Sequence, residues 1–215
     1  MAVGVGHATI MSEYSRRAVH ASGVGMPTIY LLGIVNWTQL RYFMLLVTAI
    51  VFTLEGLRLG VGFEHWLYDE ATREYEQHAV AGYALYMLSM TSVAVLFAPM
   101  VSIPAMLMLI IADPISGMLG DNAEDEHKRL AVVGVTFGLC ALLAVPFTYA
   151  GVGGMAGIAA GIVGGGFGAV ADGIKPIVAG VGVDDNLTIP PAATIGIVVT
   201  FLLFGVDTGF DPLWV

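Results

Sequence analysis

Three adjacent oxygen-bearing side chains, Asp184, Asp185 and Asn186, come directly before an apolar run that begins at Leu187. Carboxylate and amide oxygens are ligands that Mg²⁺ accepts, usually together with substrate phosphates. A helix start requires one such residue as its N-cap, which Asp185 or Asn186 could supply, and capping and metal binding can coexist. We therefore expect Asp184 and Asp185 to bind a metal ion and Asn186 to contact a nucleotide.

Two further acidic residues lie in or beside apolar stretches, where an ionisable side chain is costly and marks a functional site by default. Asp113 is followed by Gly117 and Gly120, which leave room for a ligand to approach. Asp172 ends a glycine-rich stretch, three residues before Lys175. The structural alternatives are an Asp113 that caps a broken helix and an Asp172 that pairs with Lys175. We expect Asp172 to bind metal and Asp113 either to bind metal or to accept a proton.

Basic residues complement these acids. Arg16, Arg17 and His20 lie three or four positions apart, so they share a helix face and could clamp a phosphate. Lys128 and Arg129 follow an acidic run and could hold nucleotide phosphates. For both groups the alternative is a topology signal beside the membrane. Together with Lys175, these residues form the predicted substrate-binding set.

The composition indicates the elements that must position these groups. The 215 residues include only 8 Lys and Arg and 17 Asp and Glu, whereas 57% are hydrophobic and the mean hydropathy is +0.84. A soluble domain has about a quarter charged residues. The chain is therefore predicted to be an all-α polytopic membrane protein, which excludes a soluble enzyme, a disordered tail and a nucleic-acid binder. The single cysteine, Cys140, excludes a disulfide framework.

About 20 apolar residues span a bilayer as a helix, and charged residues divide this chain into stretches of that length. We expect seven spans. The stretches 79–119 and 130–171 each hold two, divided near Pro99 and Pro104 and near Pro146 and the glycines that follow it. The others are 18–40, 42–63 and 187–206. Residues 1–215 are thus predicted to be a single transmembrane catalytic domain, with residues 15–206 as its helical core.

Orientation follows from the positive-inside rule. With a cytoplasmic N-terminus, seven of the eight basic residues fall inside and only Arg41 falls outside. Fifteen of the 17 acids also fall inside, the exceptions being Asp207 and Asp211. The protein is therefore predicted to lie in the cell membrane, with its site on the cytoplasmic side. Near the second span's cytoplasmic end, Glu55 and Arg58 are expected to form an ion pair or to orient a substrate.

Glycines recur every fourth residue at Gly153, Gly157, Gly161 and Gly165. This spacing puts them on one helical face and predicts close approach of a neighbouring helix. The neighbour could belong to the same chain or to a second copy in a homodimer. A phosphate-binding loop at 164–168 is disfavoured because the Lys-Ser/Thr pair of a Walker loop is missing.

Carboxylates for a divalent ion, cations for phosphates and an apolar body for a lipid indicate phosphoryl or nucleotidyl transfer between a soluble nucleotide and a membrane lipid. The alternative from another class is an ion-coupled transporter. A transporter would place its charges near the bilayer midplane, often in repeated halves, whereas these charges lie at one face and the sequence shows no repeat.

Four blocks resemble the phytol and farnesol kinases and their dolichol-kinase relatives. The segment 184–190, Asp-Asp-Asn-Leu-Thr-Ile-Pro, resembles the family's Asp-Asp-Asn-Leu-Thr-Val-Pro. Residues 16–20 with Gly23 are similar to Arg-Lys-x-x-His-x-x-Gly, and 113–120 is similar to Asp-x-x-Ala-x-x-x-Gly. Asp172 falls where relatives carry an acid. The four blocks keep the family's order from residue 16 to about residue 190.

The resemblance implies a Mg²⁺-requiring kinase that transfers the γ-phosphate of CTP to a long isoprenoid alcohol such as dolichol or polyprenol. It also implies membership of a wider superfamily that includes CDP-diacylglycerol synthases, so a CDP-lipid synthase is the second reading. Two positions depart from the family pattern. Ser116 stands in place of alanine, and Leu130 and Ala131 follow Arg129 in place of a Gly-Ser pair. The second departure bears on nucleotide contacts and choice.

Overall fold

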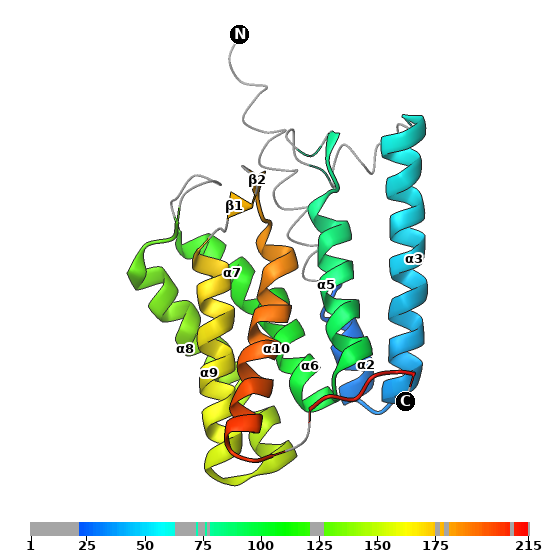
Figure 1. Cartoon of the computed structure of the whole chain (residues 1–215). Helices are drawn as coiled ribbons and strands as arrows, with labels where there is room; N and C mark the ends of the chain where they lie inside the picture. Colours follow the sequence, from blue (N-terminus) through cyan, green and yellow to red (C-terminus); the bar gives the residue numbers. More distant parts are fainter. Residues whose placement is uncertain are drawn as a thin grey trace.

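The computed structural model describes residues 22–62, 72, 76, 78–120, 127–174, 177–178, 181–206 and 209–214. Within these residues nearly every element is helical, and the long helices run side by side (Figure 1). The helices are α2 (Gly25–Leu31), α3 (Trp37–Val61), α5 (Gly82–Leu96), α6 (Pro99–Leu107), the π-helical turn η2 (Met108–Ala112), α7 (Asp113–Leu119), α8 (Leu130–Val152), α9 (Gly154–Gly173) and α10 (Asp185–Leu203). A two-residue antiparallel pair, β1 (Ile177–Val178) and β2 (Val181–Gly182), connects α9 to α10.

Five helical segments are long and apolar enough to cross a membrane: α3, the continuous segment Pro99–Leu119, α8, α9 and α10. The helix α5 is also apolar but has 15 residues. The coarse prediction of an all-helical, membrane-embedded protein is therefore confirmed, with five segments of spanning length among the described residues.

The segment Pro99–Leu119 is the central one. Within the apolar 18-residue stretch of this segment, 61% of the residues are buried inside the protein, compared with 11% for α3 and 22% for α8. The main core gathers buried side chains of α3, α5, α6, η2, α8 and α10. Asp113 lies on this central segment, so its position is set by packing from several sides.

Several predicted helix boundaries are wrong. The break expected at Arg41 lies earlier, because Asn36 and Gln39 form a capping box that starts α3 at Trp37. Arg41 is buried inside α3, where its guanidinium donates to the Ala94 carbonyl oxygen at 2.8 Å and to Asp211 Oδ2 at 2.7 Å. These partners offset the cost of burying the charge, so the arginine need not end the helix.

Prolines mark the turns less closely than we predicted. Pro104 and Pro146 both lie inside helices, α6 and α8, rather than between them. The turn before α6 lies at the extended residues Phe97 and Ala98, with Pro99 in the first helical turn. The turn after α8 lies at 153–154, where both glycines have positive φ, which side-chain-bearing residues rarely adopt.

The π-helical turn η2 directly precedes Asp113-Pro114. Pro114 has no N–H to donate, and in a regular α-helix its ring would clash with the carbonyl four residues earlier. The wider π turn accommodates this proline while the segment continues to Leu119. Asp113 thus sits at a local irregularity of an otherwise continuous helix.

The glycine stripe of α9 packs against neighbouring helices of the same chain, as the spacing predicts. A Cβ atom at Gly161 would lie 2.6 Å from Val145 Cα, and one at Gly165 would lie 2.6 Å from Ala141 N. On the adjacent face, a Cβ at Gly164 would lie 2.4 Å from Ile197 Cγ1 of α10. Gly153, by contrast, precedes α9 as its N-cap. The stripe thus fixes α8, α9 and α10 at short distances, without a second chain.

Candidate metal centre

Three carboxylates from distant parts of the sequence meet at one end of the bundle. Asp113 begins α7, Asp172 lies in the last turn of α9, and Asp185 begins α10. Each offers one oxygen atom, and the three oxygens lie within 4.8 Å of one another. The ends of α9 and α10 concerned are the upper ones in Figure 1. The structure thus brings together three of the four predicted metal ligands.

Lys128 lies among these carboxylates. Its Nζ atom is 2.7 Å from Asp172 Oδ1 and 3.9 Å from Asp113 Oδ1, and it donates to Ser116 Oγ at 3.0 Å. Ser116 Oγ in turn donates to Asp172 Oδ2 at 2.6 Å. Asp172 therefore has both oxygens engaged while its side chain is only 2% exposed. This pairing differs from the expectation from sequence, in which Lys128 holds phosphates and Lys175 is the alternative partner of Asp172.

The charge balance of the cluster suits a divalent cation. With all three carboxylates ionised, one ammonium group leaves an excess of two negative charges among these described side chains. Like charges this close repel strongly at low dielectric unless a cation or a proton compensates them. A divalent cation that prefers hard oxygen ligands would offset this negative charge and bind the carboxylate oxygens.

The start of α10 divides its polar residues between two tasks. Asp184 is the N-cap, and its Oδ1 atom accepts from the Asn186 backbone N–H at 2.9 Å and from Asn186 Nδ2 at 2.7 Å. The cap is therefore Asp184, whereas the sequence pointed to Asp185 or Asn186. With the cap supplied, the neighbouring Asp185 carboxylate can join Asp113 and Asp172. Asn186 Oδ1 is buried and has no hydrogen-bond partner among the described residues.

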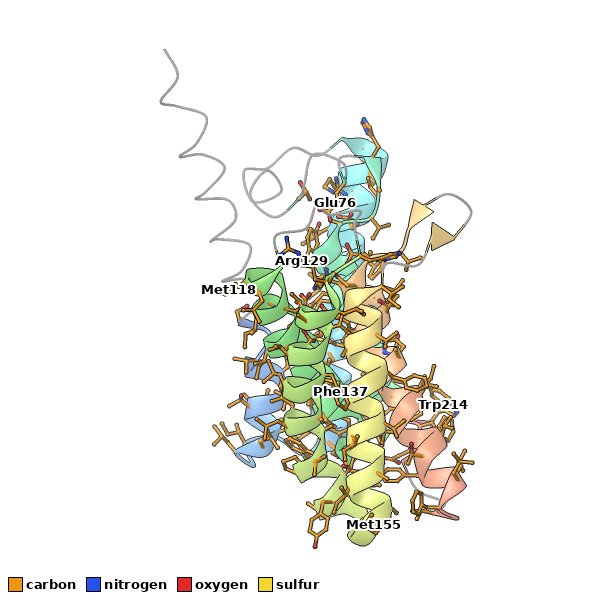
Figure 2. All side chains as sticks on the ribbon, turned by 90° about the vertical axis from the view of Figure 1, so that its left-hand side faces the viewer. Glu76, Met118, Arg129, Phe137, Met155 and Trp214 are labelled. Atoms are coloured by element: carbon orange, nitrogen blue, oxygen red, sulfur yellow. The ribbon has the colours of Figure 1, made fainter. Side chains whose placement is uncertain are left out.

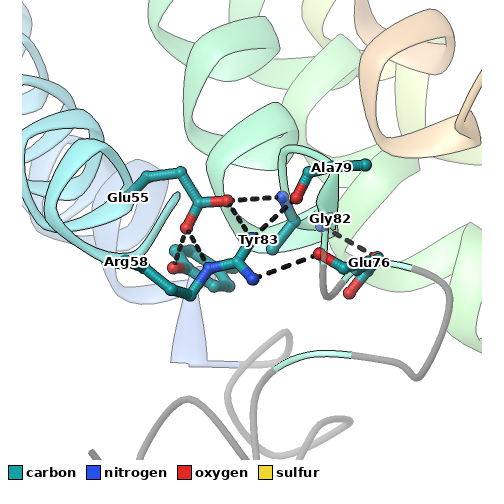
Figure 3. A network of polar contacts seen from close by, with 7 residues as sticks. Glu55, Arg58, Glu76, Ala79, Gly82 and Tyr83 are labelled. Carbon is teal, nitrogen blue, oxygen red and sulfur yellow. Dashed lines mark hydrogen bonds and ion pairs between the residues drawn. The ribbon is translucent and has the colours of Figure 1, made fainter. Parts of the chain in front are cut away.

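A second polar network joins α3 to the start of α5 (Figure 3). Arg58 Nη2 lies 2.6 Å from Glu55 Oε1 and donates to the Ala79 carbonyl oxygen at 2.7 Å. Glu55 also accepts from the Ala81 N–H at 2.8 Å and from the Tyr83 hydroxyl. Of the two roles expected for Glu55 and Arg58, the structure displays the ion pair.

At Gly82, the start of α5 comes close to the first turn of α10. The Gly82 N–H donates to Glu76 Oε1 at 3.0 Å. A Cβ at Gly82 would lie 3.3 Å from Asn186 Nδ2. From the same side, Ser89 Oγ of α5 donates to the Asn186 carbonyl oxygen at 2.5 Å. The first turn of α10 is thus positioned by α5 as well as by its own cap.

The remaining predicted residues are exposed, lie at a helix end or fall outside the described residues. Gly117 is exposed, and a Cβ there would meet open space; Gly120 ends α7. Arg129 is exposed at the start of α8 (Figure 2). Arg16, Arg17, His20 and Lys175 lie outside the residues that the structure describes.

Two substitutions at Asp184 separate its capping role from metal binding. Asp184→Asn should leave the unfolding free energy nearly unchanged because asparagine caps as well as aspartate, whereas Asp184→Ala should lower it by about 1 kcal/mol. Unfolding of the purified protein in detergent measures both. If Asp184 only caps the helix, the Asn variant also keeps the wild-type affinity for Mg²⁺. A loss of affinity in a stable Asn variant would instead place the Asp184 carboxylate on the metal.

No family model, curated protein or solved structure matches this chain. The resemblance to isoprenoid-alcohol kinases therefore rests on the four sequence blocks alone.

Proposed function

We propose that this protein is a Mg²⁺-dependent lipid kinase that transfers the γ-phosphate of CTP to the hydroxyl of a long-chain isoprenoid alcohol such as dolichol or polyprenol. The observation that carries the proposal is the meeting of Asp113, Asp172 and Asp185 at one end of membrane-spanning helices. Phosphoryl transfer depends mainly on positioning and charge neutralisation, which a metal and a few charged side chains can supply.

The described residues fit a magnesium ion. Asp113, Asp172 and Asp185 would hold it, and the unpartnered Asn186 Oδ1 offers a further hard oxygen for the metal or the nucleotide. When bound, the ion would neutralise phosphate charge. Ser116 and Lys128 fix the orientation of the Asp172 carboxylate. Asp113, on the central helix, would either bind this ion or accept the proton of the lipid hydroxyl.

The proposed topology has seven spans in the cell membrane, with the N-terminus and the metal centre on the cytoplasmic side. The distribution of basic residues supports it. So does the ion pair between Arg41 and Asp211, because this topology puts both on the outer side and their side chains lie 2.7 Å apart. A cytoplasmic site would have access to soluble CTP.

A CDP-lipid synthase could use the same cluster, because nucleotidyl transfer has the same need for a metal and for charge neutralisation. A transporter fits less well, since Asp172 and Asp185 lie at the ends of α9 and α10 rather than halfway along them. The products distinguish the two enzymes: a kinase releases CDP, and a synthase releases pyrophosphate.

The direct test supplies the purified full chain in lipid nanodiscs with γ-³²P-labelled CTP, Mg²⁺ and either dolichol or geranylgeraniol. The proposal expects labelled lipid phosphate, with CDP released and no product after chelation by EDTA. Pyrophosphate release with a phosphatidate substrate would transfer the assignment to the synthase. The absence of any lipid product with CTP, ATP, GTP or UTP would overturn both.

A further inference from the structure

An apolar groove runs along the outer surface of α9, between α8 and α10. Its volume is about 670 Å³, within the range of small-molecule sites. Phe137 of α8 forms one wall, Ala192 of α10 forms the other, and Gly166 and Phe167 of α9 line it between them. Among its lining residues only Thr188 carries a polar side chain. Because all three helices are candidate membrane spans, this groove opens toward the bilayer.

One end of the groove is lined by residues close in sequence to two of the three carboxylates. On α9 its lining includes Ala171 and Ile174, which flank Asp172. On α10 it includes Thr188, one helical turn after Asp185, and the Thr188 hydroxyl lies 3.5 Å from the Asp185 carbonyl oxygen. The groove therefore ends between the two helix termini that carry these carboxylates. This position beside the metal centre distinguishes the groove from an arbitrary crevice between lipid-facing side chains.

A glycine keeps the middle of the groove open. A Cβ at Gly166 would have only the Phe137 ring near it, at 3.7 and 3.8 Å, which is ordinary contact. Three other glycines of α9 lie nearby: Gly164, Gly165 and Gly168. A Cβ at any of them would lie less than 3 Å from an atom of a neighbouring helix. Those three glycines allow helices to pack closely, whereas Gly166 leaves open space on the surface of α9.

We infer that this groove holds the hydrocarbon chain of the lipid acceptor, with the hydroxyl at the Thr188 end and directed toward Asp185. The identity of the headgroup rests on the proposed function; the position of the chain rests on the groove. A single unbranched or isoprenoid chain suits the lining, which offers hydrogen bonds only at the end nearest the carboxylates.

The length of the groove bears on selectivity. Its α9 lining extends from Ile162 to Ile174, which at 1.5 Å per residue is about 18 Å, shorter than the roughly 30 Å hydrocarbon core. Prenols too short to fill it should bind more weakly. Chain segments beyond it should lie in the bilayer and add no affinity, so KM should fall with chain length and then level off.

Gly166→Leu tests the placement, because its side chain fills the groove. We expect the KM for geranylgeraniol to rise about tenfold, as the bound chain loses contacts worth about two buried methylene groups, while the KM for CTP stays unchanged. Gly138→Leu is the matched control: it lies on α8 beside Phe137, a Cβ there meets open space, and it does not line the groove. Ala192→Leu narrows the groove from α10 and should repeat the effect if Gly166→Leu folds poorly.

A prenol carrying a photoreactive diazirine gives a readout that does not require turnover. In nanodiscs its crosslinks should map to 162–174 and Phe137, and excess geranylgeraniol should compete with them while excess phospholipid should not. Crosslinks elsewhere, equal competition by phospholipid, or an unchanged KM in both groove variants would overturn the inference even if lipid phosphorylation occurs. Competed groove crosslinks without phosphorylation of any lipid would sustain the inference and contradict the kinase proposal.

Discussion

Asp185→Asn should lower lipid phosphorylation by at least about 10²-fold and raise the Mg²⁺ concentration needed for half-maximal rate. The substitution keeps the size of the side chain but removes one of three charges whose oxygens lie within 4.8 Å. Losing one preorganised electrostatic partner of a transition state commonly costs 10²–10³-fold in rate (about 3–4 kcal/mol). Initial rates over a Mg²⁺ titration, with the γ-labelled CTP assay, measure both quantities.

The helix start should survive this substitution, because the cap is provided by Asp184. Unfolding of Asp185→Asn should therefore match that of the wild type, which separates a loss of chemistry from a loss of fold. Asp211→Asn is a control from the opposite end of the helix bundle (Figure 1): its carboxylate pairs with Arg41, away from the metal centre. It should keep its rate per folded molecule. A folded Asp185→Asn variant with the wild-type rate would remove Asp185 from the metal site.

The sequence was sufficient to predict the membrane character and the main acidic residues. A long apolar chain with few charges is predicted to lie in a membrane, where helices satisfy the backbone hydrogen bonds within each segment. In such a chain an ionisable residue is conspicuous because its burial must be compensated. Asp113 and Asp172 could be singled out for this reason although 59 positions separate them, and the structure places them together.

The partners of those acids could not be predicted in the same way. The contacts of Asp172 with Ser116 and Lys128 depend on how α7, the start of α8 and the end of α9 pack, and no local pattern encodes that. Helix ends were misplaced for a different reason. A charged residue is expected to end a span, whereas Arg41 is buried inside α3. The local signal for the start of this helix is the capping pair Asn36 and Gln39.

The largest expected effect on stability comes from Lys128→Met. The side chains of Lys128 and Asp172 are only 11% and 2% exposed, and their charged atoms lie 2.7 Å apart. Removing the ammonium leaves three carboxylates close together with no cation among the described side chains in direct contact. Removing one partner of a buried pair typically costs 3–5 kcal/mol because the other charge stays buried and unpaired. We expect a loss of about 3 kcal/mol when the free energy of unfolding is measured in detergent without divalent ions.

Two additions to this experiment identify the cause. Lys128→Met combined with Asp172→Asn should be less destabilised than the sum of the single variants, because the double variant leaves no buried charge from this pair. Mg²⁺ should raise the melting temperature of Lys128→Met more than that of the wild type, since the variant's cluster has one positive charge fewer among the described side chains. Additive single effects together with an equal response to Mg²⁺ would show that Lys128 does not neutralise the cluster, and would return it to the phosphate-binding role that its sequence position suggests.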